Sequence, residues 1–175
     1  MSATLADAPV AALSESMRER FAREVAKYPP EGKQSAVMAC LTIVQAEQGW
    51  ISPAIEKAVA EYLGMPPMAV HEVVSFYNMY NAKPVGRFKL NVCTNLPCQL
   101  RGGAEAVAYL ENALGIVDGD TTPDGLFTLQ HCECLGACAD APVMLVNDQN
   151  MCSFMSDDKL QQLVAGRKAA EGGAR

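Results

Sequence analysis

The chain has 175 residues, of which 50% are hydrophobic and 19% are charged, so it can bury a core and is not a disordered chain. Twenty acidic residues against fourteen basic ones give a net charge of −6, which argues against sequence-independent binding to nucleic acids and against docking on anionic lipid. This length allows one domain, or at most two small ones.

The amino-terminal segment does not have the features of a targeting sequence. The first basic residue is Arg18, and Asp7 and Glu15 precede it. A secretory signal begins with positive charge, and a mitochondrial transit peptide is rich in arginine and poor in acid. No apolar stretch approaches the ~18 residues of a membrane span. We therefore expect a soluble cytoplasmic protein, in which thiols stay reduced and clustered cysteines indicate metal or redox chemistry.

The first half of the chain has the hydrophobic spacing of α-helices. Apolar residues recur every three or four positions and predict four helices, near residues 13–25, 35–48, 53–63 and 67–74. Ser52 and Pro53 are typical of a helix start, and Gly49 and Gly64 of helix ends. We expect residues 1–12 to be a disordered tail and residues 13–82 to form a helical bundle.

The pattern changes near residue 83, where alternating residues begin to indicate β-strands. Strands are predicted near residues 88–92, 127–131, 143–146 and 151–154. Helices are predicted from about Arg101 to Leu114 and from Ser156 or Asp157 to about Ala165. This order, β-α-β-β-β-α, is typical of a mixed sheet with helices packed on it. The fold class is thus α+β or α/β, with residues 83–166 as a mixed-sheet sandwich domain and residues 167–175 as a second tail.

The seven cysteines are the most informative residues. Their number is odd, which excludes a complete set of intrachain disulfides, and only Cys40 lies in the first 92 residues. Cys93 and Cys98 form a C-x4-C pair after the first predicted strand, and Cys134 and Cys138 form a C-x3-C pair after the second. If those strands are neighbours, both loops leave the sheet at one edge and four thiolates converge. Such a site suits one [2Fe–2S] cluster, with one iron for each loop, or one tetrahedral zinc ion.

The residues between the cysteines favour the cluster. An oxidised [2Fe–2S] cluster with four thiolates is negatively charged, and neither Thr94–Pro97 nor Leu135–Ala137 contains a carboxylate. Three glycines are expected to allow close backbone approach, Gly102, Gly103 and Gly136. The helix that begins near Gly102 would direct its positive end toward the site, and Arg101 adds a cation. Zinc fits less well, since C-x2-C is its commoner spacing.

Three other interpretations of the thiols stay open. Four buried thiols without a metal are one, and structural zinc is another. A thiol–disulfide oxidoreductase is the third, although it would usually show C-x-x-C at a helix start.

The remaining cysteines and the two histidines carry weaker signals. Cys132 is interpreted as a strand thiol, with a substitute ligand as the alternative. Cys40 and Cys152 are expected to be buried small hydrophobes. His71 and His131 are interpreted as structural, because a Rieske-type site would need two neighbouring histidines.

The segments Cys93–Gly102 and Glu133–Cys138 resemble those of a known family, the thioredoxin-like [2Fe–2S] subunit of NADH:quinone oxidoreductase (respiratory complex I). Further similar segments are Tyr28-Pro29, Val73–Tyr80 and Ala141-Pro142, and the resemblance covers roughly residues 14–165. It implies a helical amino-terminal domain followed by a thioredoxin-like domain. It also implies a cis peptide bond before Pro142. The implied cluster ligands are Cys93, Cys98, Cys134 and Cys138.

The resemblance further implies a partner, the subunit that binds FMN and oxidises NADH. The chain would accept single electrons from that FMN and reach further iron–sulfur subunits through the partner, in a peripheral arm at the cytoplasmic face of the inner membrane. Related subunits serve NAD-linked hydrogenases and formate dehydrogenases. The sequence lacks G-x-G-x-x-G after a strand and G-x-x-x-x-G-K-[ST], so we expect FMN and NADH on the partner and no catalytic residue in this chain.

Three aromatic residues near the end of the helical half allow two interpretations. Phe76, Tyr77 and Tyr80 either contribute to the interface with the partner or pack against the second domain.

Overall fold

The structure is a computed structural model that describes residues 13–172. The predicted tail at residues 1–12 lies outside this range. The chain divides into two compact units, Met1–Pro84 and Val85–Arg175, and the boundary expected near residue 82 falls close to this division. Within residues 13–172, no helix is both long enough and apolar enough to cross a membrane.

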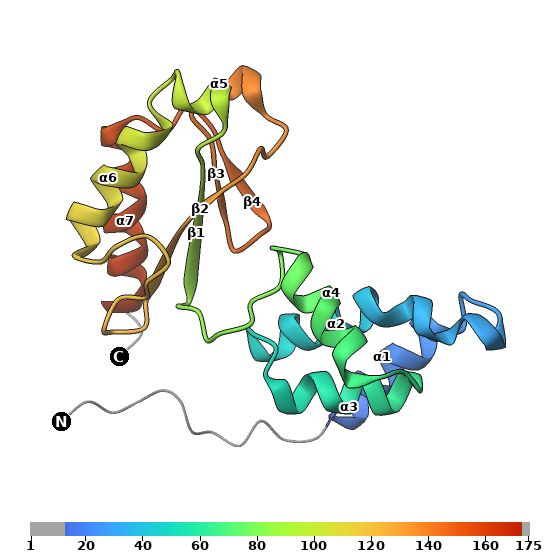
Figure 1. The fold of residues 1–175 in the computed structure, drawn as a ribbon. Helices are drawn as coiled ribbons and strands as arrows, with labels where there is room; N and C mark the ends of the chain where they lie inside the picture. Colours follow the sequence, from blue (N-terminus) through green and yellow to red (C-terminus); the bar gives the residue numbers. More distant parts are fainter. Residues whose placement is uncertain (1–12, 173–175) are drawn as a thin grey trace. The chain divides into compact units, whose positions relative to one another are not determined.

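The first unit consists of helices (Figure 1). Its elements are α1 (Glu15–Val25), the 3-10 helix η1 (Pro30–Ala36), α2 (Val37–Gln48), α3 (Pro53–Leu63) and α4 (Pro67–Phe76). The four predicted helices are therefore present. Ser52 caps α3 by accepting a hydrogen bond from the Ile55 backbone N–H at 3.3 Å, and Gly49 and Gly64 end α2 and α3 in the left-handed conformation.

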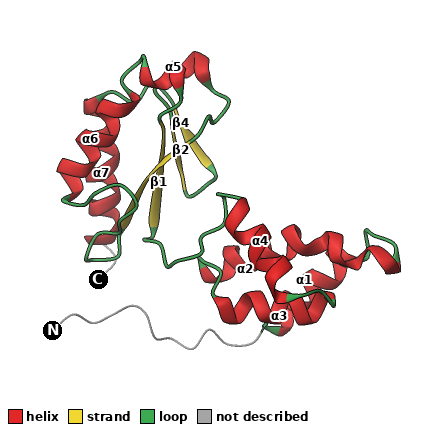
Figure 2. Ribbon diagram, viewed as in Figure 1, coloured by secondary structure: helices red, strands yellow, loops and turns green. Residues whose placement is uncertain are grey.

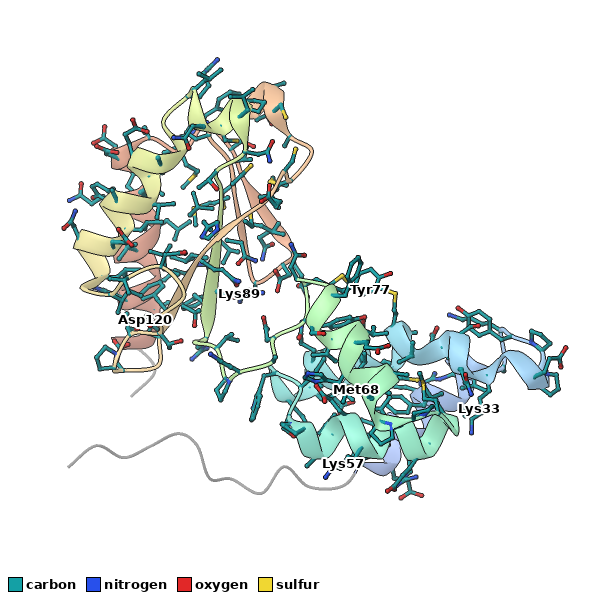
Figure 3. All side chains as sticks on the ribbon, viewed as in Figure 1. Lys33, Lys57, Met68, Tyr77, Lys89 and Asp120 are labelled. Atoms are coloured by element: carbon teal, nitrogen blue, oxygen red, sulfur yellow. The ribbon has the colours of Figure 1, made fainter. Side chains whose placement is uncertain are left out.

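The 3-10 helix η1 was not predicted, and it begins where the sequence indicated a break. Contacts with the end of α3 hold it. Lys33 donates to the Tyr62 carbonyl oxygen and places its ammonium 4.7 Å from the centre of the Tyr62 ring, and the Gln34 amide donates to the Gly64 carbonyl at 3.2 Å. Lys33 is labelled in Figure 3. These contacts join residues about 30 positions apart, so local sequence patterns do not reveal them.

Tyr80 corrects one expectation. It is only 6% exposed, it belongs to the core of the helical unit, and its hydroxyl donates to the Met38 carbonyl at 2.9 Å. Tyr80 therefore neither forms a partner surface nor needs the second unit for its burial. Phe76 is 80% exposed and Tyr77, labelled in Figure 3, is 38% exposed.

The second unit contains a four-stranded sheet (Figure 2). Its elements are β1 (Phe88–Cys93), α5 (Leu96–Gln99), α6 (Gly103–Leu114), β2 (Phe127–Cys132), the 3-10 helix η2 (Cys138–Asp140), β3 (Met144–Val146), β4 (Asn150–Cys152) and α7 (Asp157–Gly172). The strand order is β2-β1-β3-β4, with β1 and β2 parallel and the other neighbours antiparallel. The predicted mixed sheet is thus confirmed.

The helices α6 and α7 pack on one face of this sheet, as Figure 1 shows. Alternate strand residues, among them Phe88, Leu90, Phe127 and Leu129, form the core with apolar residues of these helices. The Ala141–Pro142 peptide bond is cis, as predicted.

The predicted tail at residues 167–175 is wrong in part, because α7 continues through Gly172. Lys168, Ala169 and Ala170 favour a helix. Gly166 favours it less, but the helix continues through this position. The Arg167 guanidinium lies 4.9 Å from the centre of the Phe88 ring, which ties this part of α7 to β1.

The contact between Arg167 and Phe88 yields a test of the extended helix. Arg167→Ala should lower the free energy of unfolding by roughly 0.5–1 kcal/mol, because a cation–π contact and side-chain packing are lost. Denaturant unfolding measures this change. The exposed neighbour Lys168 provides the control, since Lys168→Ala should have a smaller effect. Equal effects of the two substitutions would contradict the contact.

Cys40 in α2 yields a test of the first core. Burial, reinforced by the charge of Glu24 and partly offset by Lys33, raises the pKa of the Cys40 thiol to about 12. Because the thiolate is the reactive form, we expect iodoacetamide to leave Cys40 unmodified in the folded protein at mildly alkaline pH and to alkylate it after unfolding. Peptide mass spectrometry distinguishes the two states, with Cys40→Ala as the control. Rapid alkylation of Cys40 in the folded protein would show that this core is open.

Candidate cluster-binding site

The parallel strands β1 and β2 bring the two cysteine loops to one edge of the sheet. Their register runs from Phe88 opposite Phe127 to Cys93 opposite Cys132, so both strands end at the same level. The Thr94 backbone N–H donates to the Cys132 carbonyl at 3.1 Å and extends this pairing by one step. The loop with Cys98 and the loop with Cys134 and Cys138 therefore start side by side, as a shared site requires.

The first cysteine pair is buried. Cys93 and Cys98 are 2% and 1% exposed, and they form a small core with Ala141 and Val143. The short helix α5, which the sequence did not predict, turns the chain so that Cys98 returns to the end of β1. The Cys93 backbone N–H donates to the Val143 carbonyl at 3.1 Å.

The second pair lies in an exposed loop. The sulfur atoms of Cys134 and Cys138 are 3.9 Å apart, and both residues are exposed. Gly136 lies between them with φ of 76°, a left-handed conformation that favours glycine, and its backbone N–H donates to the Cys134 sulfur at 3.4 Å. A backbone donor of this kind stabilises negative charge on the sulfur atom.

Without a bound metal, two of the four thiols hold their protons more firmly than a free cysteine. Burial is the main cause that raises the pKa of Cys98, and a backbone hydrogen bond from Val143 lowers it in part. The pKa of Cys138 is raised chiefly by its hydrogen bond with Cys134. A metal ion must displace these protons, because thiolates are the ligands.

The four thiols lie in two pairs, one on each loop. In residues 13–172, no group of three or more His, Cys, Asp or Glu side chains is gathered closely enough to hold a single metal ion. A tetrahedral zinc site would need all four thiolates around one ion. A [2Fe–2S] cluster needs two thiolates for each of its two irons. The two pairs, one on each loop, match the two thiolates that each iron of such a cluster needs.

The acidic residues beside the second loop have hydrogen-bond partners of their own. Glu133 accepts a hydrogen bond from the Asn95 amide at 2.7 Å, and Asp140 accepts one from the Ser153 hydroxyl at 3.1 Å. The contact between Asn95 and Glu133 joins the two cysteine loops directly. Local sequence patterns do not reveal this contact, since the two residues are 38 positions apart.

The expectation of close approach at three glycines is correct only for Gly103. A Cβ atom there would lie 2.8 Å from the Cys93 carbonyl oxygen, and 3.0 Å from the carbonyl carbon and oxygen of Cys98. A Cβ atom at Gly102 would meet only a Glu105 carboxylate oxygen, at 4.0 Å, and one at Gly136 would meet nothing within 4 Å; these two glycines instead adopt positive φ values of 97° and 76°. The first turn of α6 thus packs directly against the backbone of the first cysteine pair.

Arg101 is exposed, and it lines a surface groove with Ala141, Pro142 and the first residues of α7. The structure shows no contact between its guanidinium and the four thiols within the described residues. The expected cation beside the site is therefore a charge on the surface of the same domain.

The other candidate residues lie as follows. Cys132 is half-buried and packs against the first pair, and burial, followed by the effect of Cys93, raises its pKa to about 12. Cys40 lies in the core of the helical unit, whereas Cys152 is only half-buried at the end of β4.

The two histidines lie beside carboxylates. The ring of His71 lies 3.0 Å from a Glu56 carboxylate oxygen, and that of His131 lies 2.5 Å from an Asp118 carboxylate oxygen. Each histidine thus contacts a carboxylate and not a cysteine.

Comparison with known proteins decides the family. The family model for thioredoxin-like [2Fe–2S] ferredoxins matches residues 21–168. The chain belongs to this family. It is 44% identical over 146 residues to NADH-quinone oxidoreductase subunit 2 of Thermus thermophilus, covering 83% of this chain and 81% of that protein. It is 40% identical over 156 residues to an NADH-quinone oxidoreductase subunit of Rhizobium meliloti, covering 89% of this chain and 91% of that one.

A solved structure of an NAD⁺-reducing [NiFe]-hydrogenase in the air-oxidised state also resembles this member of the ferredoxin family. The TM-score is 0.64 at 19% identity, over 79% of this chain and 23% of the hydrogenase chain. At this identity the likeness concerns the fold alone.

The packing of Gly103 against the first cysteine pair can be tested by substitution. Gly103→Ala should lower the free energy of unfolding by roughly 1–3 kcal/mol, because the new methyl group must displace backbone atoms. It should also lower the amount of bound iron severalfold, as measured by iron analysis and visible absorption. Gly166 in α7 is the matched control, since a Cβ atom there meets nothing within 4 Å. Gly166→Ala should leave the iron content unchanged, and an equal iron loss in both variants would contradict the role of Gly103.

Proposed function

We propose that this chain is an electron-transfer subunit of an NADH:quinone oxidoreductase and carries one [2Fe–2S] cluster on Cys93, Cys98, Cys134 and Cys138. The observation that carries the proposal is the parallel pairing of β1 and β2, which delivers two cysteine pairs to one edge of the sheet. Membership of the ferredoxin family and the relatives named as NADH-quinone oxidoreductase subunits support the same conclusion.

The two cysteine pairs would hold the cluster in different surroundings. When bound, a [2Fe–2S] cluster accepts and returns one electron at a time. Cys93 and Cys98 would hold it from a side that excludes water, because both are buried. Cys134 and Cys138 would hold it from an exposed loop, in which the Gly136 N–H already donates to sulfur.

The proposed electron donor is the FMN of a partner subunit that oxidises NADH. Neither G-x-G-x-x-G after a strand nor a P-loop motif is present in this sequence, which supports the assignment of FMN and NADH to the partner. On this proposal the chain has no catalytic residue of its own and reaches further iron–sulfur subunits through that partner. Its place would be a peripheral arm at the cytoplasmic face of the inner membrane.

Two alternatives are less well supported. An equivalent subunit of a hydrogenase or formate dehydrogenase would have the same fold, but the likeness to the hydrogenase structure is at 19% identity. A structural zinc subunit is disfavoured by the cysteine spacings, because C-x4-C and C-x3-C differ from the C-x2-C that zinc sites commonly show. Purification of the native protein together with its partners distinguishes these settings, because each complex contains a different flavoprotein assembly.

The ligand set can be tested one residue at a time. Serine in place of Cys93, Cys98, Cys134 or Cys138 should each reduce the cluster content severalfold, because one thiolate ligand is lost. Electron paramagnetic resonance of the reduced protein, together with iron and sulfide analysis, measures the content. Cys152→Ser in the same domain is the control and should retain the cluster. A colourless native protein that contains zinc and no iron would rule out the proposed function.

A further inference from the structure

Cys132 is a fifth thiol beside the proposed ligands. In the parallel ladder Cys132 is the direct partner of Cys93, so both side chains lie on the same face of the sheet. Cys132 also packs on the buried core that contains Cys93 and Cys98. No sequence motif requires a thiol here, since the two spacings that suggest ligands do not include it.

The backbone around this pair is fixed from both sides. The Cys93 N–H donates to the Val143 carbonyl of the neighbouring segment, and the Cys132 carbonyl accepts from the Thr94 N–H, both at 3.1 Å. These two bonds hold Cys132 beside Cys93 and leave side-chain rotation as the main freedom of its thiol. The thiol is therefore positioned by the sheet and not by a mobile loop.

The S–H group of Cys132 has no competing acceptor in the described part of the chain. There the structure shows no hydrogen bond from its sulfur to a protein oxygen or to the Cys93 sulfur, whereas the Cys152 thiol contacts the Asn150 carbonyl oxygen at 3.8 Å. A thiol is a weak donor, and a ligand thiolate is a strongly charged acceptor. When Cys93 binds iron, its sulfur becomes such an acceptor within the same small core.

We propose that Cys132 is a positioning residue that donates its S–H toward the Cys93 sulfur and so raises the reduction potential of the cluster. This inference rests on the proposed function. Reduction adds negative charge to the ligand sulfurs, and a hydrogen bond to sulfur favours the more negative state. Cys132 is accordingly not a ligand, and the cluster should survive its replacement.

Three substitutions separate hydrogen bonding from packing. Cys132→Val and Cys132→Ala both remove the donor but differ in size, whereas Cys132→Ser keeps a donor at nearly the size of alanine. In the full-length protein, Val and Ala should each shift the ratio of reduced to oxidised cluster at fixed applied potential roughly two- to tenfold toward oxidised, since one weak hydrogen bond is lost. For a one-electron couple, a tenfold shift corresponds to about 59 mV. Cys132→Ser should remain closer to the wild type than either.

Potentiometric titration followed by electron paramagnetic resonance measures these shifts, with Cys152→Val as the control that should leave the potential unchanged. The proposal is overturned if Val and Ala keep the wild-type potential. It is also overturned if the potential follows side-chain size, with Ala and Ser shifted alike and Val unchanged. Loss of the cluster in all three variants would make Cys132 a ligand instead. A wild-type protein without any [2Fe–2S] cluster would overturn the proposed function together with this inference. Loss of the cluster in all three variants would overturn the inference and change the proposed ligand set, whereas an unchanged or size-dependent potential would overturn the inference alone.

Discussion

The parallel pairing of β1 with β2 is the constraint on which the candidate site depends. Its register is set by burial, because Phe88, Leu90, Phe127 and Leu129 must all face α6 and α7. A slip of one residue would turn one strand's apolar side chains away from these helices. The hydrophobic core of the second unit thus determines where both strands end, and the strand ends determine where the two cysteine loops begin.

A second interaction places the segment that encloses the first cysteine pair. The turn between β3 and β4 has two residues with positive φ, Asn147 and Asp148, and the Asp148 carboxylate accepts hydrogen bonds from Lys89 at 3.2 Å and from the Asn91 amide at 2.6 Å. Lys89 is buried, and a buried ammonium is tolerated only when its charge is paired. This pairing joins the turn to β1. It thereby helps to hold β3, and the Val143 carbonyl just before it, beside Cys93.

The cysteines of this chain differ in surroundings more than in sequence context. Cys40 lies in the core of the helical unit, where burial raises its pKa to about 12. Cys132 shares the raised pKa but lies directly beside Cys93. Cys134 and Cys138 are exposed. Cysteines in this chain are therefore core residues, neighbours of the site or candidate ligands, depending on the helix, strand or loop in which they lie.

Hydrophobic period, helix caps and motif spacing are local properties, so the amino-acid sequence alone predicts the four main helices of the first unit, the mixed sheet of the second and the two cysteine pairs. It did not determine η1, the burial of Tyr80 or the contact between Asn95 and Glu133, since each depends on residues far apart in the chain. The sequence patterns also predicted that α7 ends too early, because the contact of Arg167 with Phe88 of β1 is not visible in them. That one cysteine pair is buried and the other exposed follows from the packing of the sheet and is not visible in the sequence. That difference arises because Cys93 ends a central strand that is paired on both sides and α5 packs Cys98 against it, whereas Cys134 and Cys138 lie in a loop that follows an edge strand.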